Sequence, residues 1–141
     1  MKKIVLAFIT ILLSTVSMLA DGVGTWKNYL SYYEPTEIEK GSGNMLYVLA
    51  SNGLYTYNTN DQSLQTFDKT NGLSDCTISH IKWNKNTKNL IIVYDNANID
   101  IMYGNSNSDI VNISDYYSKS MTEDKTVNNI YIYGKHALLA T

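Results

Sequence analysis

The chain has 141 residues and a formal net charge of −2, with eleven lysines and no arginine. An acidic chain without arginine lacks the counterion release and the bidentate guanidinium contacts that favour nucleic-acid binding, so we expect no nucleic-acid partner. Cys76 is the only cysteine, so no internal disulfide can form. Core burial and sheet hydrogen bonds must therefore hold the fold.

The first twenty residues are predicted to be a secretory signal peptide. Two lysines give the positive start, and residues 4–13 form an apolar run interrupted once by a threonine. That run is shorter than the roughly 20 residues of a membrane-spanning helix, which disfavours the alternative of a membrane anchor. Cleavage after Ser17 and cleavage after Ala20 both stay open. We expect a mature domain over residues 21–141, exported to the periplasm or the outer-membrane surface and without a transmembrane segment.

From residue 26 onward, short apolar and aromatic runs alternate with a period of two and are bounded by Asn, Asp, Gly and Ser. This pattern predicts strands and turns, and the twelve tyrosines suit half-buried pleated surfaces. The predicted strands, in chain order, are 26–32, 36–39, 45–50, 53–58, 63–68, 78–83, 90–94, 99–103, 110–113, 129–133 and 137–140.

The predicted strands recur in groups of four, which is typical of propeller blades. Leu46 and Leu90 begin equivalent runs 44 residues apart, and the pattern restarts at residues 137–140. An apolar strand that would lie innermost precedes each unit; its apolar residues are Ile38, then Ile78 and Ile81, then Ile130 and Ile132. The sequence therefore predicts an all-β fold of four-stranded antiparallel blades.

The third unit is expected to be cut off after its second strand, at Thr141. A propeller needs roughly 4–8 blades to close, so about two and a half blades make an incomplete β-propeller. The alternative is an open meander or a sandwich of about ten strands.

Two turn motifs resemble the two-component-regulator propeller repeat. Asn71-Gly72-Leu73-Ser74-Asp75 is similar to the turn that joins one blade to the next, with positive φ at Asn-Gly and a leucine between the blades. Asn52-Gly53-Leu54-Tyr55-Thr56-Tyr57 is similar to the hairpin of that repeat, and Asn52 and Gly53 both tolerate positive φ. The segment Asp95-Asn96-Ala97-Asn98 is predicted to form the matching hairpin of the second unit, although it departs from the motif.

Residues 26–141 as a whole resemble the N-terminus of PorZ-type proteins of the Bacteroidetes type IX secretion system. The matching features are Trp26-Lys27-x-Tyr29-Leu30-Ser31-Tyr32, the hairpin and turn motifs above, Tyr94-Asp95-Asn96-x-Asn98-Ile99-Asp100, Asn112-Ile113-Ser114-Asp115 and Lys125-Thr126-Val127-Asn128. The resemblance implies two propellers and a C-terminal sorting domain in a cell-surface complex. It also implies a role in attaching secreted cargo to anionic lipopolysaccharide, by supplying that lipopolysaccharide to a sortase partner.

We therefore expect a non-enzymatic scaffold whose partners are the secretion and sortase proteins and an anionic lipopolysaccharide or another glycan. The main alternative is a periplasmic propeller of a hybrid two-component regulator that senses polysaccharide fragments. A third hypothesis, an exported glycan lyase or hydrolase, needs catalytic residues that we do not find in residues 21–141.

No catalytic, cofactor-binding or metal-binding residue is predicted, and the binding residues stay unknown. Cys76 and His80 are four residues apart, roughly 13 Å on an extended chain, which is too far for a thiolate–imidazole pair unless a turn intervenes. Neither His80 nor His136 has a carboxylate at zinc-ligand spacing. The oxygen-rich stretch at Asp95, Asn98 and Asp100 could hold calcium, but a self-bonding Asx turn explains it as well.

An aromatic cluster near the start of the mature segment could stack on sugar rings. It consists of Trp26, Tyr29, Tyr32 and Tyr33. Aromatic residues that alternate along a strand more often make one core face and one solvated face, and this remains the preferred interpretation.

Overall fold

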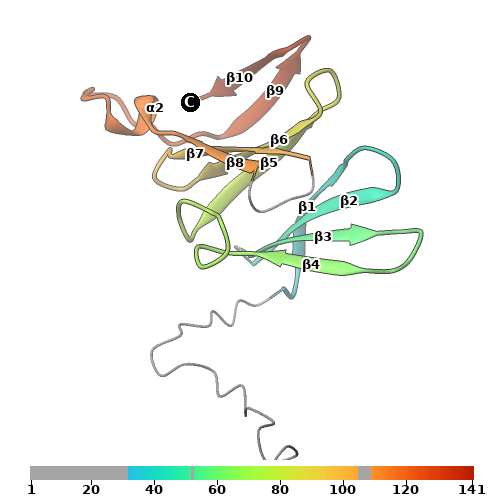
Figure 1. Cartoon of the computed structure of the whole chain (residues 1–141). Helices are drawn as coiled ribbons and strands as arrows, with labels where there is room; N and C mark the ends of the chain where they lie inside the picture. The colour runs from blue at the N-terminus through green and yellow to red at the C-terminus, as the bar shows by residue number, and fades with distance from the viewer. Residues whose placement is uncertain (1–31, 52, 105–108) are drawn as a thin grey trace, which may run out of the picture.

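The computed structural model describes residues 32–51, 53–104 and 109–141. They form two four-stranded antiparallel sheets and a two-stranded hairpin, which follow one another along the chain (Figure 1). The predicted signal peptide and almost all of the predicted strand 26–32 lie outside the described residues.

Each sheet has its strands in chain order. The first sheet contains β1 (Pro35–Lys40), β2 (Met45–Ala50), β3 (Gly53–Asn58) and β4 (Leu64–Phe67). The second contains β5 (Ile78–Asn84), β6 (Asn89–Tyr94), β7 (Ile99–Tyr103) and β8 (Ile110–Ile113). The hairpin pairs β9 (Asn129–Tyr133) with β10 (His136–Ala140).

The predicted strands between residues 36 and 140 are confirmed, with ends that shift by one residue at most. The short helix α2 (Asp115–Ser118) was not predicted, because four residues are too few to show a helical period. It is closed by the Ser118 amide, which donates to the Ser114 carbonyl at 2.8 Å.

The three units stack side by side through their first strands. β1 lies against β5, and β5 lies against β9. Figure 1 shows the successive sheets arranged in this order. This arrangement confirms the predicted blades and inner strands of a propeller, because a single sandwich would not repeat one sheet beside the next.

The two full sheets share one register as well as one strand order. Glu37 pairs with Leu49 in the first sheet, and His80 pairs with Val93 in the second. The register shifts at the same place in both inner strands, between Pro35 and Glu37 and between Ile78 and His80. Equivalent positions of the blades can therefore be compared directly.

Two apolar cores fill the spaces between neighbouring sheets. The first lies between sheets one and two and contains Tyr47, Leu49, Leu54, Phe67, Leu73, Ile78, Ile81, Leu90, Ile92, Tyr94 and Met102. The second lies between sheet two and the hairpin and contains Ile91, Val93, Ile99, Val127 and Ile130. Because β6 contributes to both cores, all six of its residues are buried.

The turns place positive φ partly at other residues than predicted. In the interblade turn Gly72 has the predicted positive φ, at 130°, whereas Asn71 is not among the positive-φ residues. In the first hairpin the positive φ falls on Ser51, at 44°, and Gly53 is not among the positive-φ residues. Asn52 lies outside the described residues. Gly53 is instead required by close packing, because a Cβ there would lie 2.9 Å from Cε1 of Tyr32. In the second hairpin Ala97 has a φ of 66°.

Leu73 from the interblade turn fills the first core, where it is 5% exposed. We predict that Leu73→Ala lowers the free energy of unfolding of the propeller domain by about 2–5 kcal/mol, because it leaves a cavity between two sheets. Leu64→Ala is the matched control, since Leu64 is 58% exposed, and it should cost less than about 1 kcal/mol. If urea denaturation gave the same loss of unfolding free energy for Leu73→Ala and Leu64→Ala, Leu73 would not join the sheets.

Candidate interaction surface along the inner strands

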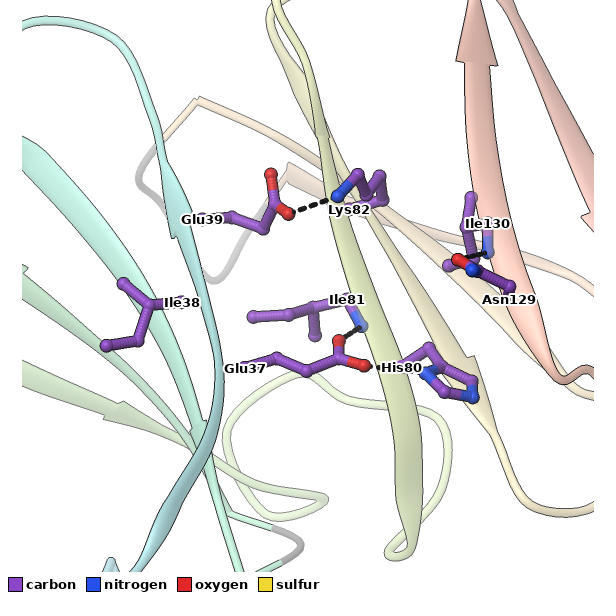
Figure 2. A pocket seen from close by; sticks show the side chains of 8 residues that line it. All are labelled: Glu37, Ile38, Glu39, His80, Ile81, Lys82, Asn129 and Ile130. Carbon is purple, nitrogen blue, oxygen red and sulfur yellow. Dashed lines mark hydrogen bonds and ion pairs between the residues drawn. The ribbon is translucent and has the colours of Figure 1, made fainter.

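Two glutamates of β1 reach across to the edge of β5. One carboxylate oxygen of Glu37 lies 2.6 Å from Nδ1 of His80, and the other accepts the Ile81 amide at 2.8 Å. Glu39 repeats this pattern two residues further on. These contacts connect the first two blades at their inner edge, and Figure 2 shows those of Glu37 with His80 and Ile81 and that of Glu39 with Lys82.

The Glu39 carboxylate accepts a hydrogen bond from the Lys82 ammonium at 2.6 Å and another from the Trp83 amide at 3.2 Å. Each carboxylate therefore binds one side chain and one backbone N–H of the neighbouring strand. These N–H groups lie on the edge of the sheet and would otherwise need water or another acceptor. We call this set of four contacts the carboxylate clasp.

The clasp borders a cavity of about 230 Å³ between the inner strands. Its walls come from all three blades, and its lining residues are Glu37, Ile38, Glu39, His80, Ile81, Lys82, Asn129 and Ile130. A larger cavity of about 700 Å³ adjoins it along β5 and β9 and shares Glu39, Lys82, Asn129 and Ile130 with it.

The larger cavity is lined by cationic and aromatic side chains. Lys40, Lys82 and Lys85 contribute three ammonium groups, whereas Glu39 is the one carboxylate in the lining. Tyr131 also lines this cavity and is 67% exposed. This is a local positive region in a chain whose net charge is negative.

Packed side chains and hydrogen bonds hold the lining of the larger cavity in place. Trp83 stacks on Tyr47 with ring centroids 5.3 Å apart. Burial raises the pKa of Tyr47 to about 12, and its hydroxyl donates to the Gly104 carbonyl at 2.8 Å. The Asn86 side chain donates to the Gly134 carbonyl at 2.6 Å, which ties the β5–β6 turn to the β9–β10 turn.

The structure does not combine Cys76 and His80 into a reactive pair. The Cys76 thiol is exposed and the Cys76 amide donates to Asp75, whereas the His80 ring contacts Glu37. His136 is exposed at the start of β10. Across residues 32–51, 53–104 and 109–141, no group of three His, Cys, Asp or Glu residues is placed to hold a metal.

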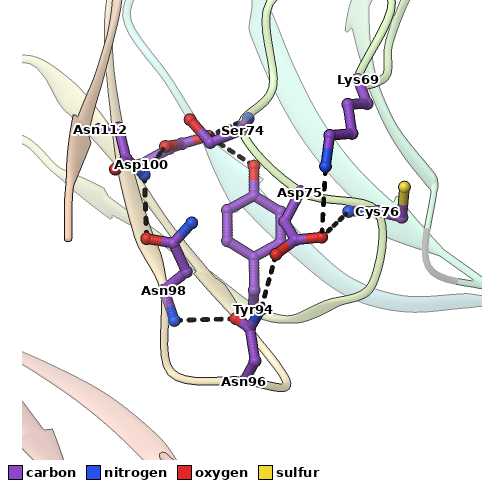
Figure 3. Close-up of polar contacts among 9 residues, drawn as sticks. All are labelled: Lys69, Ser74, Asp75, Cys76, Tyr94, Asn96, Asn98, Asp100 and Asn112. Atoms are coloured by element: carbon purple, nitrogen blue, oxygen red, sulfur yellow. Dashed lines mark hydrogen bonds and ion pairs between the residues drawn. The ribbon is translucent and has the colours of Figure 1, made fainter. Parts of the chain in front are cut away.

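The oxygen-rich hairpin of the second blade binds protein donors. Asp100 is fully buried and accepts the Tyr94 hydroxyl at 2.5 Å, the Ser74 amide at 2.8 Å and the Asn112 side chain at 2.8 Å (Figure 3). Burial, and next the bond to Asp100, raise the pKa of Tyr94 far above that of a free tyrosine. These contacts fix the interblade turn to β7.

Asp75 holds the other side of this turn. Its carboxylate accepts the Cys76 amide at 2.9 Å and the Asn96 side chain at 2.6 Å. These two hydrogen bonds, the amide first, lower the pKa of Asp75, and Lys69 at 3.9 Å adds to the effect. The Asp75 carboxylate therefore satisfies a backbone amide of its own turn.

The aromatic cluster is only partly among the described residues. Tyr32 contacts Tyr55 edge-to-face with ring centroids 5.8 Å apart, and Tyr33 is 79% exposed. Trp26 and Tyr29 lie outside the described residues, so a sugar-stacking role of this cluster stays a prediction.

Sequence reasoning missed the clasp residues Glu37, Glu39, His80 and Lys82. A usable signal is present, since acidic residues flank Ile38 and basic residues flank Ile81 at the same spacing. Such complementary pairs predict a contact only when the two strands are known to be neighbours.

Stacked four-stranded sheets with their first strands innermost define a β-propeller. The family model of the PorZ N-terminal β-propeller domain of the type IX secretion system matches residues 46–141, which is more than half of the chain. The chain belongs to this family.

Two solved structures are similar to the chain. One is PorZ of Porphyromonas gingivalis, described as an essential bacterial surface component of the type IX secretion system. It has 27% identity and a TM-score of 0.74, with 83% of this chain and 15% of that chain covered. The other is the extracellular domain of a putative one-component system of B. thetaiotaomicron. It has 21% identity and a TM-score of 0.53, with 76% of this chain and 14% of that chain covered. At this identity the similarity shows the fold alone.

The chain therefore spans about a seventh of each of these structures. No curated protein matches it. In the part of the chain that the structure describes, no helix is long and apolar enough to cross a membrane.

The clasp predicts measurable coupling between Glu37 and His80. In a double-mutant cycle of Glu37→Gln and His80→Gln, urea denaturation should give a coupling energy of about 1 kcal/mol, because the pair is short and partly buried. The control cycle, Lys69→Gln with Asp75→Asn, tests the longer and more exposed pair and should give close to zero. A Glu37–His80 coupling no larger than the control would contradict the clasp.

The Asp100 network predicts a second stability effect. Asp100→Asn replaces a carboxylate oxygen with an NH₂ group that faces the donors of Tyr94, Ser74 and Asn112. Because a buried donor then loses its acceptor, the free energy of unfolding of the propeller domain should fall by about 2–3 kcal/mol. Asp95→Asn, in the same hairpin but exposed, should stay within about 0.5 kcal/mol of the parent. Thermal and urea unfolding measure both variants, and a neutral Asp100→Asn would exclude the anchoring role.

Proposed function

We propose that this chain is part of a non-enzymatic scaffold of the type IX secretion attachment complex. The observation that supports this most strongly is the family match over residues 46–141, together with 27% identity to PorZ over 83% of the chain. The matched structure is described as a bacterial surface component, which supports an extracytoplasmic location. We place the protein at the outer-membrane surface.

The blades would serve as a rigid platform for protein partners. Their faces are packed into two apolar cores, and their inner edges are joined by the carboxylate clasp. A platform of this kind holds a partner in a fixed orientation without taking part in bond making. We propose that the platform brings anionic lipopolysaccharide to the sortase that anchors secreted cargo.

A sensing role is the second candidate, and less supports it. The similarity to the extracellular domain of a putative one-component system is at 21% identity, and blade architecture alone accounts for it. The family match points to secretion.

The role can be tested in cells with the full-length protein. Tagged protein should co-purify with the cell-surface sortase complex, and deletion of its gene should release cargo from the surface into the medium. Complementation with the full-length gene should restore attachment, whereas a gene lacking residues 32–141 should not. Normal cargo attachment after deletion, with no sortase proteins in the pull-down, would exclude the secretion role.

A further inference from the structure

The turns that follow the inner strands lie together at one end of the blades. The clasp glutamates bind N–H groups in the same order along β1 and β5, so these two strands run in the same direction. The hydrogen bond from Asn86 to Gly134 joins the β5–β6 turn to the β9–β10 turn. Figure 1 shows these turns on the opposite side of the molecule from α2. We call this side the turn end; it comprises residues 40–44, 59–63, 85–88, 104, 109 and 134–135.

The turn end is cationic, although the chain as a whole is acidic. Its charged residues are all exposed; they are Lys40, Lys85, Lys88, Lys135, Asp61 and Asp109. The ion pairs among the described residues involve other cations, so these four ammonium groups have no carboxylate partner there. The loops at the opposite end, which comprise residues 68–77, 95–98 and 114–128, carry six carboxylates and three lysines. The two ends therefore attract partners of opposite charge.

An apolar recess opens beside two of these lysines. Lys40 and Lys85 line the cavity of about 700 Å³, together with Trp83, Ile130 and Ile132. Trp83 is half-buried and stacked on a buried tyrosine, and Ile130 is buried. The one carboxylate of the lining is already bound to a lysine of the clasp. An apolar centre within a charged rim is the usual anatomy of a protein interface.

A protein segment fits these features better than other polyanions do. The four lysines lie on three successive blades, so they meet acidic groups that are spaced along a chain and not one compact anion. The apolar part of the cavity favours an apolar side chain, which a protein segment can carry between its carboxylates. The acidic loops at the opposite end repel such a segment, and this fixes the end at which it docks.

We infer that the turn end is a docking surface for an acidic segment of a partner protein, with its carboxylates on the separate lysines and one apolar side chain in the cavity beside Trp83. This inference rests on the proposed function, because it names the face of the platform that a protein partner contacts. It requires no bond-making step.

Binding can be measured by fluorescence anisotropy on the purified full-length protein at low salt. The probe is the fluorescein-labelled peptide Asp-Glu-Asp-Glu-Phe-Asp-Glu-Asp-Glu. We expect it to bind, and added salt to weaken its binding. The same peptide with alanine in place of phenylalanine should bind about fivefold more weakly or worse, because it leaves the cavity unfilled. An uncharged peptide, with Asn and Gln in place of Asp and Glu, should not bind.

The double variant Lys40→Gln/Lys85→Gln should weaken binding of the acidic peptide about fivefold or more, because both lysines line the cavity. Lys69→Gln/Lys119→Gln is the matched control. It changes the net charge equally, but both of its lysines are exposed at the opposite end, so binding should stay within about twofold. Thermal unfolding of each variant verifies that it is folded.

The position of the apolar side chain can be tested separately. A peptide with p-benzoylphenylalanine in place of phenylalanine should cross-link, on illumination, to the cavity lining at residues 82–86 or 129–134. Mass spectrometry locates the cross-link. Cross-links confined to residues 68–77, 95–98 or 114–128 would contradict docking at the turn end.

Three further results would overturn the inference. One is no binding of the acidic peptide, and another is equal binding by the two double variants. The third is equal binding of the alanine and phenylalanine peptides, which would show a charged surface without an apolar anchor. Lysine-dependent binding to phosphatidylglycerol vesicles, without peptide binding, would show a membrane-facing surface instead. The purified protein is tested without the secretion complex, so these failures are separate from a failure of co-purification in cells.

Discussion

The structure depends on one constraint, which is that a four-stranded sheet with two apolar faces must be covered on both. The second sheet meets this condition, because the first sheet covers one face and the hairpin covers the other. Its central strand β6 is buried throughout as a result. The hairpin leaves Tyr131, Tyr133 and Leu138 exposed, on the face that a further blade covers in a propeller.

Polar contacts then determine how neighbouring blades meet at their inner edges. Apolar faces alone would allow sheets to slide, whereas the carboxylates of Glu37 and Glu39 each bind a defined N–H group and a defined cation. The buried Asp100 holds the interblade turn in a similar way, through donors from three segments. Directional bonds of this kind fix register. The second junction differs from the first, because the Ile130 amide there donates to Oδ1 of Asn129 in its own strand.

Much of the fold could be predicted from the sequence because its signals are local. Period-two runs between Asx and Gly turns gave the strands, and the 44-residue spacing of Leu46 and Leu90 gave the blades. The clasp and the Asp100 network could not be predicted in this way, because they join residues that only the stacking brings together. The role of Gly53 was misassigned for the same reason, since its constraint is the Tyr32 ring and not its own φ.

The most direct test of this account is an experimental structure of the full-length protein. The account predicts β1, β5 and β9 side by side as inner strands, with the carboxylates of Glu37 and Glu39 bound to the backbone N–H groups of Ile81 and Trp83. A structure in which these glutamates point to solvent, or in which the first two sheets do not pack face to face, would contradict it.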